Sequence, residues 1–418
     1  MKKGYLLQIE ENKDELLKFA SKLVKFKTPN LPGKNTFKSQ KWLASKLRKL
    51  GMEVDLFDVY PNEPDVIGTL KGKGGKRTLI FNGHIDVAQI RGDEMWNFDP
   101  FGGKYDKRYL YGRGSADMKG GMACAYFAIK TLVDAGVRFK ENIMFQSVIG
   151  EESGEPGTAK ALEKGYKGDF ALIPEPTSLK IMGQGGILNF WVIIKSPKTH
   201  HEGIRYKMIH AGGGIYGANA IEKMYKILTS MQELERHWAV MKKYPGIPYG
   251  ATTLNPAVII GGRHPAFIAD ECKLCFAVHF LPNEDVEDVK MEIAGHIKRT
   301  AESDLWLKKN PPKIIWVGRS PKREMMSFFP PTEINKDNPD LKILIKSYEE
   351  TLKRKPEIGV WPTVSDSGWF SMSGIPAVIC GPGNLEDAHT VNEKIAIRDM
   401  LDASKLYASF ILNFCQPL

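Results

Sequence analysis

Short apolar segments that run directly into histidine or carboxylate side chains recur along this 418-residue chain. Residues 79–81 (LIF) have the composition of a strand buried on both faces, and the chain turns polar immediately afterwards at His84 and Asp86. Successive side chains of a strand point to opposite faces, so residues two apart such as His84 and Asp86 face one pocket. Taken alone, such a pair is more often a hydrogen-bonded structural pair than part of a metal site.

Three further apolar segments repeat the arrangement. The polar residues that follow them are Glu151 with Glu152 after 143–149, Glu175 after 170–173 and, beyond a turn, His389 after 375–380. In open α/β sheets the functional site lies outside the carboxyl ends of the strands, so separate segments can deliver one set of ligands to one place. Adjacent acids at the end of a buried strand repel each other and need a positive partner, which a divalent metal ion supplies.

Asp117 lies at or just before the start of a helix predicted from residue 118 or 119 to Gly136. A helix cap is the ordinary explanation for an aspartate at this place. The surrounding glycines, at 112, 114, 120 and 121, allow closer backbone approach than a cap needs, as a carboxylate that bridges two metal ions would require. Two imidazoles and several carboxylates suit a pair of zinc ions about 3.5 to 4 Å apart that share one carboxylate.

The order of the predicted elements indicates an α/β fold interrupted by an insertion. Between about residues 186 and 320 the pattern changes to two amphipathic helices and about four strands, which suits a small α+β sandwich. We therefore predict a catalytic domain formed by residues 1–185 and 321–418, with residues 186–320 inserted into it.

Composition excludes several classes of protein. The net charge is +10, but the basic residues form short patches interrupted by Gly and Pro, without interleaved aromatic residues, so we expect no nucleic-acid surface. The five cysteines are too few and too scattered for a disulfide framework, which agrees with a reducing compartment. The amino terminus lacks the long apolar core of a signal peptide, and no membrane span is evident, so we expect a cytoplasmic protein.

The motifs NGHIDV, WNFDPFGG, LYGRGSADMKGG, GEESGEPGT, PEPT, GANAIEK, CGPGN and AHTVNE occur in this order and cover almost the whole chain. With them the sequence resembles the co-catalytic zinc amidohydrolases that include acetylornithine deacetylase, succinyl-diaminopimelate desuccinylase, aminoacylase and the glutamate carboxypeptidases. The resemblance implies a zinc-exopeptidase-like catalytic domain, with a mixed sheet flanked by helices. It also implies that the inserted α+β domain is a lid through which two chains form a homodimer.

The same resemblance implies a ligand set for two zinc ions, for which cobalt can substitute. His84 and Glu175 would hold one ion, Glu152 and His389 the other, and Asp117 would bridge them. Asp86 would orient His84, because a metal-binding imidazole commonly gives its second N–H to a carboxylate. Glu151 would be the general base. The peptide bond after Asp117 is a candidate for the cis form, as it often is in the family.

The inserted domain holds seven of the nine histidines but none of the implied zinc ligands. His210, just ahead of the GANAI helix, stands where the family's lid histidine is expected, and His201 is a competing candidate. Two departures from the family concern the substrate. Ala266 replaces the usual Asn, and His279 stands in a strand that often carries an Arg, so a substrate carboxylate would need another partner such as Arg205.

The predicted activity is metal-assisted hydrolysis of an amide in a small N-acyl amino acid or related N-acylated amine, of the deacetylase or desuccinylase type. The products are a carboxylate and a free amine, and Glu151 carries the proton from water to the leaving amine. Two alternatives within enzymes are a carboxypeptidase or dipeptidase, and a deformylase acting on a non-amino-acid amide such as an aminopyrimidine. A catalytically dead binding protein is the alternative outside enzymes, and the presence of every ligand argues against it.

Overall fold

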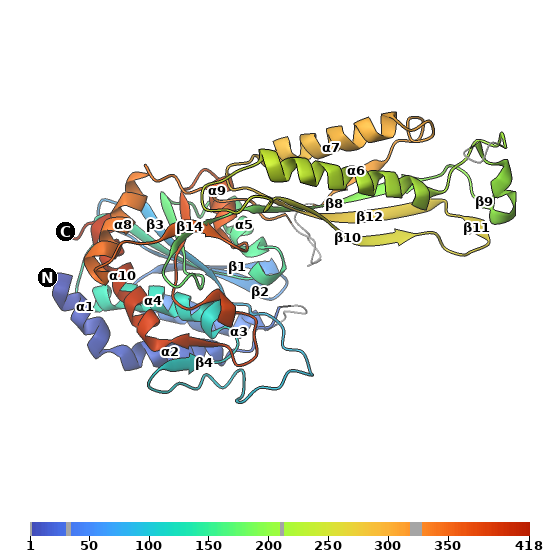
Figure 1. Ribbon diagram of the computed structural model, residues 1–418. Coiled ribbons are helices and arrows are strands. Elements are labelled where there is room, and N and C mark those ends of the chain that lie inside the picture. The colour runs from blue at the N-terminus through green and yellow to red at the C-terminus, as the bar shows by residue number, and fades with distance from the viewer. Residues whose placement is uncertain (1, 31–34, 210–212, 318–327) are drawn as a thin grey trace. The chain divides into compact units, whose positions relative to one another are not determined.

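The computed structural model describes residues 2–30, 35–209, 213–317 and 328–418 (Figure 1). The chain divides into two compact units. The first unit contains the residues up to Gln184 and those from Thr332 onward, and the second unit begins at Gly185 and ends at Pro331. Among the described residues, no helix combines the length and the apolar composition that a membrane span requires.

The first unit is built on an eight-stranded mixed sheet in the order β1-β2-β5-β3-β6-β15-β7-β14. Its strands are β1 (Glu53–Tyr60), β2 (Glu63–Leu70), β3 (Thr78–His84), β5 (Asn142–Val148), β6 (Phe170–Ile173), β7 (Ile181–Gln184), β14 (Ile358–Trp361) and β15 (Ala377–Ile379). The neighbours β5, β3, β6 and β15 run parallel, whereas β2 pairs antiparallel with β1 and β5. Parallel neighbours end at the same edge, so the segments that follow these four strands lie together.

Helices surround this sheet, and those that pack on it directly bury its central strands. They are α1 (Lys2–Glu11), α2 (Lys13–Val24), α3 (Thr36–Lys49), α4 (Gly120–Asp134), α5 (Pro156–Glu163), α8 (Pro339–Leu352), α9 (Ser367–Met372) and α10 (Ile397–Cys415). Helices α4 and α10 pack on each other and on β3, and α3 packs on β1 and β2. Almost every residue of β3, β5 and β6 is buried, which explains their continuous apolar sequences. The predicted α/β class with a mixed sheet is confirmed.

The second unit is an antiparallel four-stranded sheet, β10-β12-β8-β13, with two helices on the same side in Figure 1. The strands are β8 (Gly186–Lys195), β10 (Thr253–Gly261), β12 (Glu271–Phe280) and β13 (Lys313–Trp316), and the helices are α6 (Ala220–Met241) and α7 (Val286–Glu302). Asn219 and Asp285 cap these helices by accepting hydrogen bonds from backbone N–H groups of the first turn. The two helices and the four strands of the main sheet agree with the sequence pattern, and a short pair of strands, β9 (His200–His201) and β11 (Phe267–Ile268), is present in addition.

The five cysteines are buried free thiols. Burial raises the pKa of Cys124 and of Cys380 to about 12, so neither thiol ionises near neutral pH. Cys272 and Cys275, which are three residues apart in β12, are also buried. The cysteines are therefore small core residues.

The chain leaves and re-enters the first unit at a single place. Gln184 and Thr332 exchange two backbone hydrogen bonds of 3.0 Å each. We therefore expect that replacing residues 185–331 by a short Gly–Ser linker gives a folded first unit, because the linker only has to join two backbone segments that are already paired. Circular dichroism and a cooperative thermal transition would establish the fold. An unfolded product would show instead that the second unit contributes to the core of the first.

Candidate metal centre

The strand ends of the first unit place four of the expected site residues together. His84 is the last residue of β3, and Glu175 follows β6 after Pro174. Glu151 and Glu152 open a short 3-10 helix, Glu151–Ser153, which begins three residues beyond the end of β5. Because β5, β3 and β6 are parallel neighbours, these side chains meet at one edge of the sheet.

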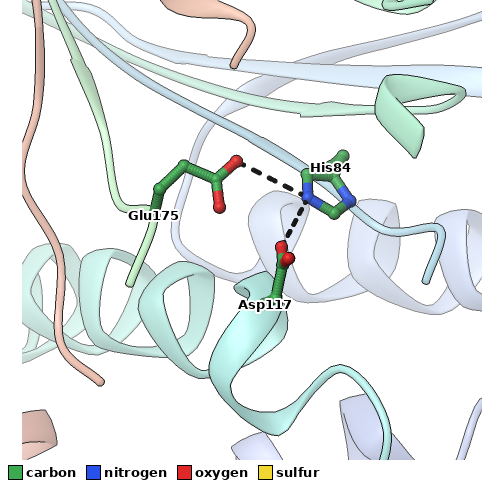
Figure 2. Close-up of side chains that lie close together, drawn as sticks. All are labelled: His84, Asp117 and Glu175. Carbon is green, nitrogen blue, oxygen red and sulfur yellow. Dashed lines mark hydrogen bonds and ion pairs between the residues drawn. The ribbon is translucent and has the colours of Figure 1, made fainter. Parts of the chain in front are cut away.

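One group of possible metal ligands consists of His84, Asp117 and Glu175. The Nε2 atom of His84 lies 3.1 Å from Oδ1 of Asp117 and 3.6 Å from Oε1 of Glu175. Figure 2 shows both carboxylates directed at this ring nitrogen. All three side chains are buried.

A second group consists of Asp117, Glu152 and His389. The Nε2 atom of His389 lies 3.1 Å from Oδ2 of Asp117 and 3.0 Å from Oε1 of Glu152. Asp117 thus directs one oxygen to each imidazole. One carboxylate with an oxygen in each of two donor groups is the arrangement that a shared ligand of two metal ions requires.

The backbone at Asp117 is not that of a helix cap. Asp117 lies within a π-turn, Ser115–Lys119, with φ −120° and ψ 100°, and α4 begins only at Gly120. The cap explanation for Asp117 is therefore wrong, because its side chain points to the two histidines and makes no cap hydrogen bond. The Asp117–Met118 peptide bond is cis, as expected.

Gly121 lets α4 approach the segment that carries Glu175. A Cβ atom at this position would lie 2.0 Å from the backbone oxygen of Pro174, closer than two such atoms can come. Any larger residue at 121 would push the end of β6 away from α4. This glycine therefore has a steric role next to the first donor group.

Asp86 orients His84 through a different atom from the one expected. The Nδ1 atom of His84 lies 2.9 Å from the backbone oxygen of Asp86, whereas the carboxylate is 3.7 Å away. That carboxylate instead accepts hydrogen bonds from the N–H groups of Gly150 and Glu152 and from the side-chain amide of Asn30. Asp86 therefore holds the loop of Glu151 and Glu152, and its main chain fixes the ring.

The hydrogen bonding of His84 and Glu175 fits a bound cation. When Nδ1–H donates to the carbonyl of Asp86, the Nε2 atom has a lone pair, and it faces two carboxylates. Among the described residues, neither oxygen of Glu175 has a hydrogen-bond partner, although the side chain is buried. Lone pairs that converge in a buried site repel one another unless a positive charge lies between them.

Titration behaviour agrees with the same conclusion. Burial raises the pKa of Glu175 to about 8 and that of Glu151 well above its usual value. Hydrogen bonds to Asp117 and Glu152 raise the pKa of His389 to about 10. The site therefore stabilises positive charge and penalises isolated negative charge, which is what a centre for divalent cations does before it is loaded.

Glu151 is adjacent to the donor groups but belongs to neither of them. Its Oε2 atom lies 3.8 Å from Nε2 of His84, and its side chain is only 13% exposed. A carboxylate beside the centre, and not among the ligands, is free to exchange a proton with a water molecule.

The residues expected in the inserted domain are placed only in part. His210 lies outside the described residues. His201 is exposed, and its Nδ1 atom accepts a hydrogen bond from the N–H of Gly203. Arg205 forms an ion pair with Glu222, so its guanidinium already has a carboxylate partner.

Two charged residues next to the centre had no role assigned from the sequence. Arg113 and Glu393 are almost completely buried and form an ion pair of 2.9 Å. Both stand in motifs that were recognised, GRGS and HTVNE. The available signal was a charged residue inside a recognised motif, which for Arg113 is also rich in glycine.

Three other buried acids were also missed. Asp65, Glu155 and Asp366 are fully buried, and burial raises the pKa of each. Glu155 belongs to the GEESGEPGT motif, in which only the two preceding glutamates were assigned roles from the sequence. Asp65 accepts a hydrogen bond from the N–H of Ile149 and so supports the end of β5.

Residues 80–413 match the model of Peptidase family M20/M25/M40. The chain belongs to this family. The predicted membership of the amidohydrolases is confirmed, and this M20 protein is an enzyme that hydrolyses amide bonds, as the motifs predicted.

Among the similar proteins is a relative whose sequence aligns with almost the full length of this chain. The N-formyl-4-amino-5-aminomethyl-2-methylpyrimidine deformylase of Bacillus subtilis (strain 168) is 46% identical over 415 residues, with 98% of this chain and 97% of the relative covered. The acetylornithine deacetylase of Vibrio campbellii is 28% identical over 366 residues, with 86% of each chain covered. The aminopeptidase PepT of Bacillus cereus shares the fold, with a TM-score of 0.72 and 21% identity over 96% of this M20 chain and 98% of PepT.

Proposed function

We propose that this enzyme removes the formyl group from an N-formylated aminopyrimidine at a centre of two zinc ions, releasing formate and a free amine. The observation that carries the substrate class is the full-length similarity to the Bacillus subtilis deformylase, which is much stronger than the similarity to acetylornithine deacetylase. The deformylase alternative is thus favoured over the leading expectation of an N-acyl amino acid.

The departures from the family pattern support a substrate without a carboxylate. Ala266 and His279 replace residues that we associated with recognition of that group. Arg205, the substitute named from the sequence, is paired with Glu222. An N-formylated aminopyrimidine has no carboxylate, so its recognition does not require a cationic side chain such as Arg205 for that purpose.

The donor groups suit the two ions. His84 and Glu175 would hold one ion, Glu152 and His389 the other, and Asp117 both. When bound, two zinc ions, or cobalt in their place, would polarise the amide carbonyl and lower the pKa of a coordinated water to roughly 7.

Glu151 is the proposed carrier of the proton. Its carboxylate accepts a proton as the water oxygen bonds to the formyl carbon, and it returns this proton to the amine nitrogen as the C–N bond breaks. The lid histidine, for which His210 remains the sequence-based candidate, would donate a hydrogen bond to the developing oxyanion.

We further propose a cytoplasmic homodimer formed through the second unit. The free cysteines support a reducing compartment. Strand β10 is an edge strand, and it exposes Val258, Ile259 and Ile260, with 37%, 57% and 58% of their surfaces accessible. An exposed apolar edge strand invites pairing with another strand unless a partner covers it.

A substrate panel tests the proposed function directly. With zinc or cobalt present, we expect kcat/KM for the N-formyl aminopyrimidine to exceed that for N-acetylornithine, N-succinyl-diaminopimelate or a dipeptide by roughly 10²-fold or more. The Glu151→Gln variant, assayed in parallel, measures any contaminating hydrolase. A preference for the dipeptide would support the peptidase alternative instead.

The role of the lid histidine across the dimer can be tested by mixing two inactive variants. Glu151→Ala and His210→Ala, dissociated together and reassembled in equal amounts, should recover roughly a quarter of wild-type activity, because about half the dimers are mixed and each mixed dimer has one complete site. Activity at the background of the single variants would place the histidine in its own subunit. Recovery with His201→Ala, together with a fully active His210→Ala, would move the role to His201.

A further inference from the structure

We propose that Arg113 and Glu393 are positioning residues that hold the second donor group in register. This inference rests on the proposed two-ion centre. The buried Arg113–Glu393 ion pair would couple the backbone at Asp117 to the backbone at His389. We call the pair the clamp. Neither residue touches the substrate or a metal ion in this proposal.

Glu393 holds the segment that carries Asp117. Its Oε1 atom accepts hydrogen bonds from the N–H groups of Ala116, at 2.9 Å, and of Asp117, at 3.2 Å. These contacts fix the non-helical turn from which the Asp117 side chain reaches both imidazoles. The Oε2 atom is left for Arg113, so one carboxylate joins two partners.

Arg113 holds the segment that carries His389. Its guanidinium donates to Oε2 of Glu393 at 2.9 Å, and to the backbone oxygens of Thr390 and His389 at 3.3 Å each. The guanidinium also lies over the ring of Trp96, with 5.2 Å between its carbon and the ring centroid. A planar group with several fixed donors can satisfy all these acceptors at once, and a lysine cannot.

His389 depends on such support more than the other ligands do. Its side chain is 53% exposed, and its backbone has φ 57°, in the left-handed region that residues with a Cβ rarely adopt. By contrast, His84 is fully buried at the end of β3. Loss of the clamp should therefore loosen the His389 side of the centre and leave the His84 side in place.

The surrounding backbone ties the same two segments together. Strand β4 (Tyr109–Tyr111) pairs with β16 (Lys394–Ala396), and the N–H of Gly112 donates to the backbone oxygen of Glu393 at 2.9 Å. The pairing explains why the clamp residues meet although they are far apart in sequence. It also keeps the two segments together when the clamp is removed, so a variant should lose the alignment of its ligands before it loses its fold.

The test is a titration of the metal-free full-length protein with Co²⁺, followed by visible absorption and calorimetry. Wild type should bind about two ions per chain. In Arg113→Met we expect the first ion to bind with unchanged affinity and the second roughly 10- to 100-fold more weakly, the usual effect of removing a partner that orients a ligand. Arg113→Lys is the milder variant because lysine can still pair with Glu393. Its affinity for the second ion should lie between those of wild type and Arg113→Met.

Arg77→Met is the matched control. Arg77 donates to both oxygens of Asp340, with 2.6 Å to Oδ1, next to the start of β3 and thus at the other end of that strand from His84. The Arg77 side chain is 38% exposed, so this variant loses a less buried arginine–aspartate ion pair and reports the effect of removing such a pair away from the donor groups. We expect it to bind both Co²⁺ ions as wild type does.

The outcomes separate the two levels of the proposal. Wild type that binds only one Co²⁺ would remove the two-ion centre, and the clamp with it. If Arg113→Met bound both ions with wild-type affinity, the clamp alone would be overturned. The clamp would also be overturned if Arg113→Met and Arg77→Met weakened the binding of both ions to the same extent. If Arg113→Met fails to fold, Arg113→Lys decides, because unchanged affinity for the second ion in that variant is also incompatible with the proposal.

Discussion

Replacing Glu151 by glutamine should lower kcat by roughly 10²- to 10⁴-fold while the metal content stays at the wild-type level. The amide has nearly the same shape as the carboxylate but cannot accept a proton from water. Glu151 lies outside both donor groups, with its Oε2 atom 3.8 Å from Nε2 of His84, so its replacement removes no proposed ligand. Steady-state kinetics and elemental analysis of the same preparation provide the measurement.

The neighbouring substitution Glu152→Gln is the matched comparison. The Oε1 atom of Glu152 lies 3.0 Å from Nε2 of His389, within the second donor group. We expect this variant to lose metal as well as activity, because a neutral amide is a poorer ligand than a carboxylate. If Glu151→Gln lost metal and Glu152→Gln retained it, the roles of the two glutamates would be reversed.

Replacing Asp117 by alanine should have the largest effect on metal content. Asp117 is the residue common to both donor groups, with one oxygen 3.1 Å from each imidazole. We expect activity at background and metal content below that of Glu175→Ala or Glu152→Ala, each of which removes a ligand from one group only. Elemental analysis after dialysis against metal-free buffer gives the comparison.

Thermal unfolding gives a second measurement of the same effect. Zinc that binds only the folded wild type should stabilise it by about 4 kcal/mol when the free ion is at 1,000 times its Kd. Asp117→Ala should lose most of this zinc-dependent rise in Tm. A variant that kept both its metal and its rise in Tm would show that Asp117 is not the shared ligand.

The elements around the centre could be predicted because their sequence patterns are strong. Strands β3, β5 and β6 are buried on both faces, so each appears as a continuous apolar run, and the first polar side chains mark the strand ends. The rule that parallel strands share one edge then placed His84, Glu152 and Glu175 together. The cis bond after Asp117 came from the family resemblance, because no pattern in the residues indicates it.

Other features could not be predicted, for physical reasons that differ. Strand periodicity gives the direction of the Asp86 side chain but does not show that its backbone oxygen is the partner of His84. The ion pair of Arg113 and Glu393 joins two distant segments, and charged residues are ordinarily assigned to the surface. Helix α1 was missed because its apolar residues do not gather on one face.

The identity of the acyl group could not be predicted from the motifs that contain the proposed ligands. The proposed metal ligands and Glu151 act on the scissile amide, which deacetylases, peptidases and deformylases have in common. The motifs that contain these residues therefore do not distinguish the substrates. The departures at Ala266 and His279 were the available signal, and from the sequence they indicated only that a substrate carboxylate would need another partner.

The strand order has a consequence for synthesis on the ribosome. Strand β15 lies between β6 and β7, although the whole second unit is translated between β7 and β15. The second unit can therefore fold during translation before β15, the partner of the open edge of β6, has been synthesised. His389 is synthesised later still, so a nascent chain cannot complete the second donor group before residue 389 has emerged. Fragments released before that point expose an unpaired apolar strand, which makes them targets for chaperones and proteases.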